Sequence, residues 1–134
     1  MLGLTVDNNE FAFMVGKRVC SISQVGETTN IFIDFESATL NVECFWRLRK
    51  LSGIIITSED KKYPDRDYSK DPIEEIKRIL IGQSIRFCDF ARETEDIFVQ
   101  FEGDIWLDVL SDSSLFESWK IDAGEQGYYV GRGF

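Results

Sequence analysis

The 134-residue chain contains no histidine. Without an imidazole it cannot build the Ser–His or Cys–His pairs that activate most nucleophiles, and it shows no glycine-rich phosphate-binding pattern. Carboxylates are plentiful, but acidic residues at alternate positions of strands are the expected solvated face of a sheet. We therefore predict that the protein is not an enzyme.

Cysteines are few, odd in number and widely spaced, at Cys20, Cys44 and Cys88. There is no CxxC pair, so a zinc site would have to be assembled from scattered thiolates without histidine. We interpret the three residues as buried, reduced cysteines of a cytosolic protein. No metal and no cofactor is expected.

Long hydrophobic runs are also missing. The longest extend over about five residues, as at 11–15, whereas a membrane-spanning helix needs roughly 20. The N-terminal residues MLGLTVDNNE lack a basic region followed by an apolar stretch, so no signal peptide is expected. These features predict a cytoplasmic protein without a membrane partner, and its length predicts one domain over residues 1–134.

What the chain does have is an internal repeat. Residues 16–36 align without a gap with residues 82–102, at a constant offset of 66. Seven of the 21 positions are identical: Gly16/Gly82, Glu27/Glu93, Thr28/Thr94, Ile31/Ile97, Phe32/Phe98, Phe35/Phe101 and Glu36/Glu102. The repeat predicts one β-rich unit used twice, over residues 16–48 and 82–121.

Apolar and polar residues alternate within both copies, which indicates strands that are buried on one face. The expected strands cover 18–25, 30–36 and 39–45 in the first copy, and 84–91, 96–102 and 105–110 in the second. A further buried strand is expected at 53–57. The predicted fold class is α+β: an antiparallel β-rich single domain of two repeated β-meander units with one or two short helices. One continuous sheet and two packed sheets are both compatible with this pattern.

A helix is expected directly before the second copy. Asp71 is a good N-cap, Pro72 suits the first helical position, and Glu74 has the spacing of a capping box. Glu74 and Arg78 would form an ion pair, and Gly82 would end the helix.

Two other segments have recognisable patterns. The first copy could begin with a shorter helix that is capped by Asp7 and ended by Gly16, although a strand is also possible there. Residues 58–70 combine Pro64 with charges of both signs and are expected to be a linker loop.

The segments 44–48 and 115–121 resemble each other and are predicted to be edge segments in which Trp46 and Trp119 are structural. The tail at 124–134 contains four glycines, which suggests turns about one short strand.

The net charge of −9 is unevenly distributed. Residues 89–125 contain 11 of the 24 acidic side chains but only Arg92 and Lys120 of the 15 basic ones, so the rest of the chain holds 13 of each sign. Such a region would repel nucleic acids and anionic membranes and would attract a basic protein. The alternative is an acidic surface that keeps the chain in solution and has no partner.

The strongest candidate for a binding surface is the expected strand after Gly103. Asp104, Trp106 and Asp108 alternate there with apolar residues and so share one face. The first copy has Thr39 and Asn41 where Trp106 and Asp108 stand. A tryptophan between two carboxylates is typical of an interface anchor with a charged rim. Alternatively, Trp106 lies in the core beneath the helix or the tail.

Other acids extend this candidate surface. Glu102 would complete its centre, and Glu93, Glu95 and Asp96 in the preceding hairpin loop would form a rim that steers a partner. The matching loop of the first copy has only Glu27 as an acid.

The succession of helix, glycine, strand and hairpin, used twice and followed by a Phe-Glu-Ser-Trp segment and a glycine-rich ending, resembles small bacterial immunity proteins. These are the inhibitors of polymorphic-toxin systems, including contact-dependent growth inhibition. The matching stretches are LIGQSI (80–85), FVQFEGDIWLDV (98–109), FESWKI (116–121) and GYYVGRGF (127–134). The long charged loop at 58–70 and Trp106 on a normally polar face depart from the family pattern.

The resemblance implies a cytoplasmic protein that binds one cognate toxin domain, as a monomer or in a 1:1 complex, and blocks it. Many such toxins are basic nucleases, so an acidic inhibitor would occupy the nucleic-acid site as a charge mimic and would not bind nucleic acid itself. The family has no catalytic residues to transfer to this chain. The alternative is a non-enzymatic small-ligand or protein-interaction module unrelated to toxins.

Overall fold

The computed structural model describes residues 11–113 and 115–131. This part of the chain forms ten strands, one α-helix and two short 3₁₀ helices. In chain order the elements are η1 (Ala12–Met14), β1 (Val19–Gln24), β2 (Ile31–Phe35), β3 (Thr39–Val42), β4 (Phe45–Lys50), β5 (Gly53–Thr57), α2 (Pro72–Leu80), β6 (Ile85–Ala91), β7 (Asp96–Phe101), β8 (Trp106–Leu110), β9 (Trp119–Asp122), η2 (Gly124–Gln126) and β10 (Tyr128–Gly131).

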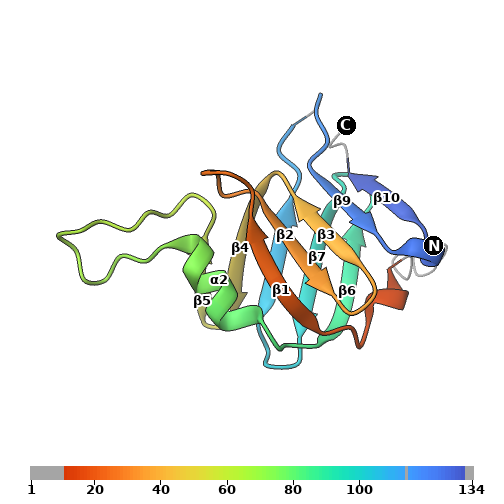
Figure 1. Ribbon diagram of the computed structural model, residues 1–134, viewed down its shortest axis with the longest axis horizontal. Coiled ribbons are helices and arrows are strands. Elements are labelled where there is room, and N and C mark those ends of the chain that lie inside the picture. The colour runs from red at the N-terminus through yellow and green to blue at the C-terminus, as the bar shows by residue number, and fades with distance from the viewer. Residues whose placement is uncertain (1–10, 114, 132–134) are drawn as a thin grey trace.

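The strands form two five-stranded antiparallel sheets that pack face to face (Figure 1). Sheet I has the order β1–β2–β3–β9–β10, and sheet II has the order β5–β4–β8–β7–β6. A mostly antiparallel, β-rich small domain with one α-helix was expected from the sequence and is confirmed. The choice between one sheet and two is resolved in favour of two.

The chain passes from one sheet to the other at two equivalent places. After β3, the chain leaves sheet I, and β4 pairs with β8 in sheet II; after β8, it leaves sheet II, and β9 pairs with β3 in sheet I. The predicted strand at 39–45 is therefore two strands. The prediction of edge segments at 44–48 and 115–121 is wrong, because β4 and β9 each lie between two other strands.

Strand registers in the two sheets follow the same sequence offset. Val19 pairs with Phe35 in sheet I, and Ile85 pairs with Phe101 in sheet II, 66 residues later in both cases. A bulge follows Val19 in β1 and Ile85 in β6.

The segments before β1 and β6 connect the sheets through a bridge between Arg18 and Ser84. The backbone N–H of Gly16 donates to the Ile85 carbonyl at 2.7 Å, and that of Gly82 donates to the Val19 carbonyl at 2.9 Å. Both glycines have φ near +92°, a conformation that residues with a Cβ avoid.

The core lies between the sheets, and Trp46 and Trp119 are its largest fully buried side chains. Each indole Nε1 also donates to a backbone carbonyl, of Thr29 at 2.9 Å for Trp46 and of Glu95 at 2.7 Å for Trp119. Both tryptophans are therefore structural, as the sequence predicted.

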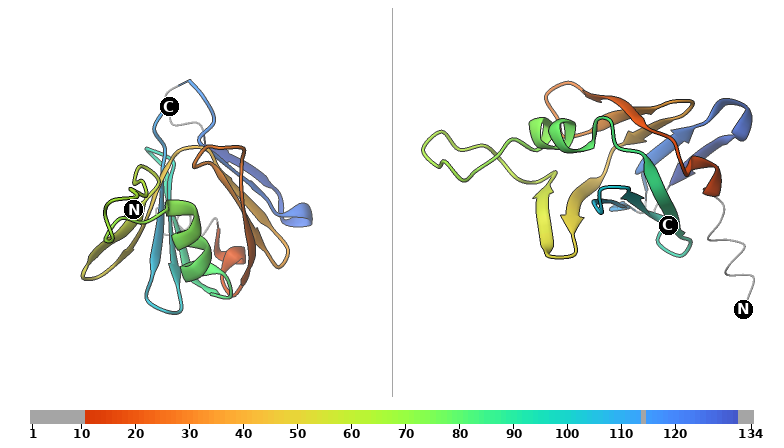
Figure 2. Two further views of the ribbon diagram at one scale, coloured as in Figure 1. Left: turned by 60° about the vertical axis from the view of Figure 1, so that its left-hand side comes forward. Right: turned by 90° about the horizontal axis from the view of Figure 1, so that it is seen from below.

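Helix α2 contacts β1 and β5, an edge strand from each sheet, and lies at one side of the wedge that the sheets form (Figure 2). Because β5 is an edge strand, the expectation that it is buried is wrong. Only Ile56 is buried there, and Ile54 is 58% exposed. Among the described residues, no helix is long and apolar enough to cross a membrane.

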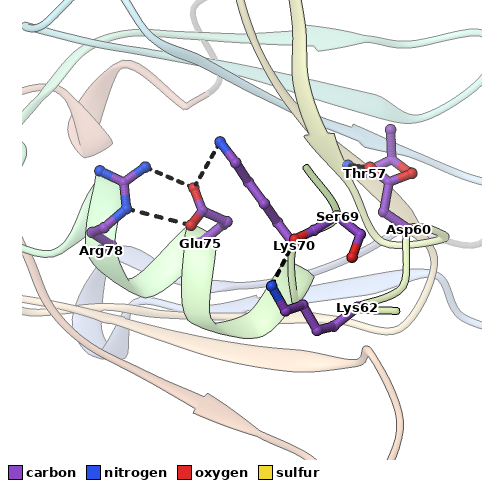
Figure 3. Close-up of polar contacts among 7 residues, drawn as sticks. All are labelled: Thr57, Asp60, Lys62, Ser69, Lys70, Glu75 and Arg78. Atoms are coloured by element: carbon purple, nitrogen blue, oxygen red, sulfur yellow. Dashed lines mark hydrogen bonds and ion pairs between the residues drawn. The ribbon is translucent and has the colours of Figure 1, made fainter. Parts of the chain in front are cut away.

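Asp71 caps α2 as predicted, since its Oδ1 accepts hydrogen bonds from the backbone N–H groups of Ile73 at 2.8 Å and Glu74 at 3.5 Å. The predicted Glu74–Arg78 pair is wrong. Arg78 instead donates to Glu75 at 2.6 Å, and Lys70 approaches the same carboxylate at 3.8 Å (Figure 3). This arrangement lowers the pKa of Glu75, chiefly through the hydrogen bond from Arg78.

Residues 58–70 contain no helix or strand and project from the body of the molecule, as expected for a linker loop (Figure 2). The first copy begins with the single 3₁₀ turn η1; its predicted cap Asp7 lies outside the described residues.

The three cysteines are free, but only Cys44 and Cys88 are buried. The prediction that Cys20 is buried is wrong. The bulge after Val19 places two consecutive residues of β1, Cys20 and Ser21, on the exposed side.

Candidate functional site: the outer face of sheet II

The outer faces of the two sheets differ in chemistry. Sheet I presents a mainly polar surface whose side chains bond one another: Ser21 donates to Asp34 at 2.9 Å, and Thr39 donates to the same carboxylate at 3.2 Å. Its exposed large hydrophobic residues are Phe32 and Tyr128.

The outer face of sheet II is aromatic and contains two arginines; we call it the sheet II face. Cross-strand pairing places its residues in two rows. One row is Thr57, Arg47, Asp108, Phe98 and Asp89, and the other is Ile54, Arg49, Trp106, Gln100 and Phe87.

Trp106 lies at the centre of the second row and is partly exposed, so it is not covered by the helix or the tail. The guanidinium carbon of Arg49 lies 4.8 Å from the centre of its ring. The ring of Phe87, which is 44% exposed, meets Trp106 edge-on at 6.4 Å. The outward orientation predicted for Trp106 is therefore observed, and two neighbours hold the ring in place.

Asp108 lies on the same face but is completely buried. Arg47 Nε and Arg49 Nε both donate to its Oδ2, at 2.8 Å and 2.6 Å. Its Oδ1 has no hydrogen-bond partner among the described residues. Asp108 therefore differs from the exposed interface acid that was expected: it neutralises one of two arginines, and the three side chains together have a charge of +1.

Asp104 and Glu102 lie in the turn between β7 and β8, at one end of the face. Asp104 is exposed, has φ of 59° and accepts a hydrogen bond from Arg86 Nη1 at 2.9 Å. Glu102 is exposed in the same turn. The carboxylate of Asp104 is thus paired within the chain, in a geometry that solvent screens.

Glu93, Glu95 and Asp96 lie at the other end of β7, in or next to the turn between β6 and β7. The Asp96 carboxylate accepts hydrogen bonds from the backbone N–H of Ser111 at 2.7 Å and from the Thr94 hydroxyl at 2.8 Å. Glu95 has φ of 63°, and its carbonyl accepts bonds from other residues. Glu93 is exposed.

The seven predicted residues therefore do not form one cluster. Trp106 and Asp108 lie in the middle of the face, while the two acidic groups are separated by the length of β7, about 17 Å at the usual rise per residue.

The acidic character expected for the surface is found at the end near Asp96, which we call the acidic end. Burial first, and then the nearby carboxylates of Asp112, Asp96 and Glu43, raise the pKa of the Cys44 thiol to about 12. The sequence reasoning missed Glu43, because it belongs to the first copy. Glu43 lies between β3 and β4, where the chain passes from sheet I to sheet II, and this brings it close to the second copy.

A metal centre or a ligand pocket would indicate a different function. Within residues 11–113 and 115–131, no group of three or more Cys, Asp and Glu side chains is placed to hold a metal ion. A surface pocket of about 400 Å³ lies between β5 and the loop 58–70, near the contacts drawn in Figure 3. Tyr63, Arg66 and Tyr68 are among its lining residues.

No family model, no curated protein and no solved structure matches this chain. The resemblance to bacterial immunity proteins therefore stays a prediction, and function has to be inferred from the geometry of the sheet II face.

Proposed function

We propose that this protein is an immunity protein, which binds a cognate bacterial toxin domain one-to-one through the sheet II face and blocks it in the cytoplasm. The toxin in this proposal is a basic domain such as a nuclease. Support comes from the residue types of the face, since Trp, Phe and Arg are enriched at protein interfaces and Trp and Arg among the residues that dominate binding energy.

The difference between matched positions of the two sheets is the observation on which the proposal rests. Ser21 in sheet I corresponds to Phe87 in sheet II, and Thr39 corresponds to Trp106. Both substitutions put an aromatic ring on an outer face, where the core does not need it. An exposed aromatic cluster of this kind is a common mark of an interaction site.

We also infer that the two sheets are copies of one unit that have diverged in their outer faces. The shared offset of 66 in sequence, in strand register and in bulge position supports this inference. A duplicated scaffold explains why the inner faces have stayed alike while only one outer face acquired Trp106 and Phe87.

In this proposal, one region attracts the partner and another region holds it in the complex. The acidic end, with Glu43, Asp96 and Asp112, steers a basic partner and raises the association rate at low salt. The aromatic residues of the sheet II face then limit dissociation. The proposed centre is therefore less acidic than the one expected from the sequence.

If this is an immunity protein, the gene directly upstream of its own should encode the toxin, and this provides the test. Its C-terminal domain is expressed with and without this protein, and growth is followed; the proposal expects arrest that this protein relieves. Trp106→Ala should weaken binding of that domain by about 30-fold or more, as for an interface hot spot. The proposed function would be contradicted if expression of that domain does not arrest growth, or if this protein does not relieve the arrest.

The pocket beside the loop 58–70 favours a second candidate function, a module that binds a small ligand. Tyr63, Tyr68 and Arg66 could hold a planar or anionic group there. A thermal-shift screen against a metabolite collection tests this. A hit that Tyr68→Ala abolishes and Trp106→Ala does not would support it, and the absence of hits would reject it.

A further inference from the structure

Arg47 and Arg49 lie two residues apart in β4 and project from the same face of sheet II. Their Nε atoms converge on one oxygen of Asp108, which is itself completely buried. The carboxylate therefore fixes both guanidinium groups from the inner side of the face.

Most donors of these guanidinium groups remain available. Each group has five N–H bonds, and within the described part of the chain only the Nε–H of each arginine donates to an acceptor. The side chains are 33% and 29% exposed, so solvent reaches part of each arginine. By contrast, Arg78 uses both Nε and Nη2 on Glu75.

The surroundings of the pair are apolar on one side. Arg49 stacks on Trp106, and Phe98 pairs with Asp108 across the next strand. Stacking and the shared carboxylate hold the arginines in one arrangement, which reduces the entropy that a ligand has to offset on binding.

We propose that Arg47 and Arg49 form a carboxylate-binding site, and that an Asp or Glu side chain of the docked protein occupies it beside an apolar residue on Trp106 and Phe98. This assignment of the occupant rests on the proposed function. Two guanidinium groups with one buried counter-charge leave a local charge of +1, which one carboxylate neutralises with charge-assisted hydrogen bonds.

A protein carboxylate fits this site better than a nucleic acid does. The site is a single positive spot on a chain of net charge −9, with Asp89 in its own row and carboxylates at both ends of β7. A polyanion crossing the face would meet those carboxylates, whereas one acidic side chain would not. The contact would fix the orientation of a partner that the acidic end attracts.

The test uses displayed random peptides selected on the immobilised full-length protein, so it does not depend on the toxin. Selected peptides should share an acidic residue next to an apolar one. Changing that acid to its amide should weaken binding by about 30-fold or more. The double variant Arg47→Lys/Arg49→Lys keeps the charge that Asp108 requires but loses the planar donors, so it should bind about tenfold or more weakly.

The matched control is Arg86→Lys, which alters an exposed arginine whose partner is Asp104. It should bind the peptides as the wild type does. Circular dichroism and the unfolding midpoint verify that each variant is folded.

Several outcomes would overturn the site: no selected peptide, peptides without a shared acid, or equal binding by the double variant. Binding of a single strand of about 12 nucleotides that requires Arg47 and Arg49 would assign the face to nucleic acid instead. Failure here and failure of the proposed function are distinguishable. A toxin domain that binds the double variant normally would reject only the site, and peptide binding without a toxin neighbour would reject only the function.

Discussion

At the residue scale, the three thiols differ in their surroundings and therefore in reactivity. Burial raises the pKa of Cys44 and of Cys88 to about 12, with smaller effects from nearby carboxylates, so both stay protonated at neutral pH. Cys20 is exposed on β1. A disulfide reagent such as Ellman's should titrate one thiol in the native protein and three in denaturant.

Cys20→Ser is the control for this thiol titration, and it should remove the native reaction. Rapid labelling of the native Cys20→Ser variant would show that Cys44 or Cys88 is accessible, in conflict with their burial.

Asp108 should matter more to stability than its neighbour Asp104, although both are acids next to arginines. Asp108→Asn leaves Arg47 and Arg49 together without their buried counter-charge. We expect a loss of about 2–3 kcal/mol in the free energy of unfolding, somewhat below the value for a fully buried pair because the arginines stay partly hydrated. Asp104→Asn breaks only an exposed ion pair, and asparagine adopts a positive φ readily. This substitution should therefore lower the free energy of unfolding by about 0.5 kcal/mol or less. Urea unfolding measures both, and equal costs would contradict this account of Asp108.

For single residues, the sequence predicted the direction of a side chain better than its burial and its contacts. Alternation along the strand placed Trp106 outward correctly, because side chains of successive residues point to opposite faces. It could not place Asp108, since the arginines that bury and neutralise it come from 61 and 59 residues earlier in the chain.

At the element scale, α2 depends on its N-cap. Asp71→Ala removes the acceptor for two backbone N–H groups and should lower the free energy of unfolding by about 1 kcal/mol. Asp67→Ala removes an exposed carboxylate from the adjoining loop and should change it by less than about 0.5 kcal/mol. If thermal or urea unfolding gives equal values, the cap is not what stabilises the start of the helix.

The glycines where the two sheets join form a natural pair for mutation. Gly16 and Gly82 have nearly the same positive φ, and a Cβ at either position would meet no atom within 4 Å. Alanine therefore adds backbone strain alone, which we expect to cost about 1–2 kcal/mol at each site. Urea unfolding of Gly16→Ala and Gly82→Ala should give similar losses; a loss at one site only would mean that the two joins are not equivalent.

Local signals predicted elements but not their partners. The cap, proline and glycine around α2 identified the helix, and alternation identified the strands, because both depend on neighbours within a few residues. The exchange of β4 and β9 between sheets was not predictable, since a strand's pattern indicates which face is buried and not which strand lies beside it. Glu43 was missed as a member of the acidic end for the same reason.

At the scale of the whole molecule, two similar layers have dissimilar surfaces. The outer face of sheet I has hydrogen-bonded polar side chains beside the exposed Phe32 and Tyr128, whereas that of sheet II has Trp106, Phe87 and a pair of arginines. The net charge lies mainly toward the second half of the chain, with an acidic end that draws on both halves. This asymmetry is the basis of our proposal that a partner binds one outer face.

The affinity of two phenylalanine variants for the proposed toxin domain tests that proposal most directly. Phe98 lies on the sheet II face, and Phe32 occupies the matching position of sheet I, 66 residues earlier, where it is 39% exposed. Calorimetry should show that Phe98→Ala binds about 30-fold or more weakly and that Phe32→Ala binds within about threefold of the wild type. Equal affinities for the two variants, or a larger loss for Phe32→Ala, would contradict binding through the sheet II face.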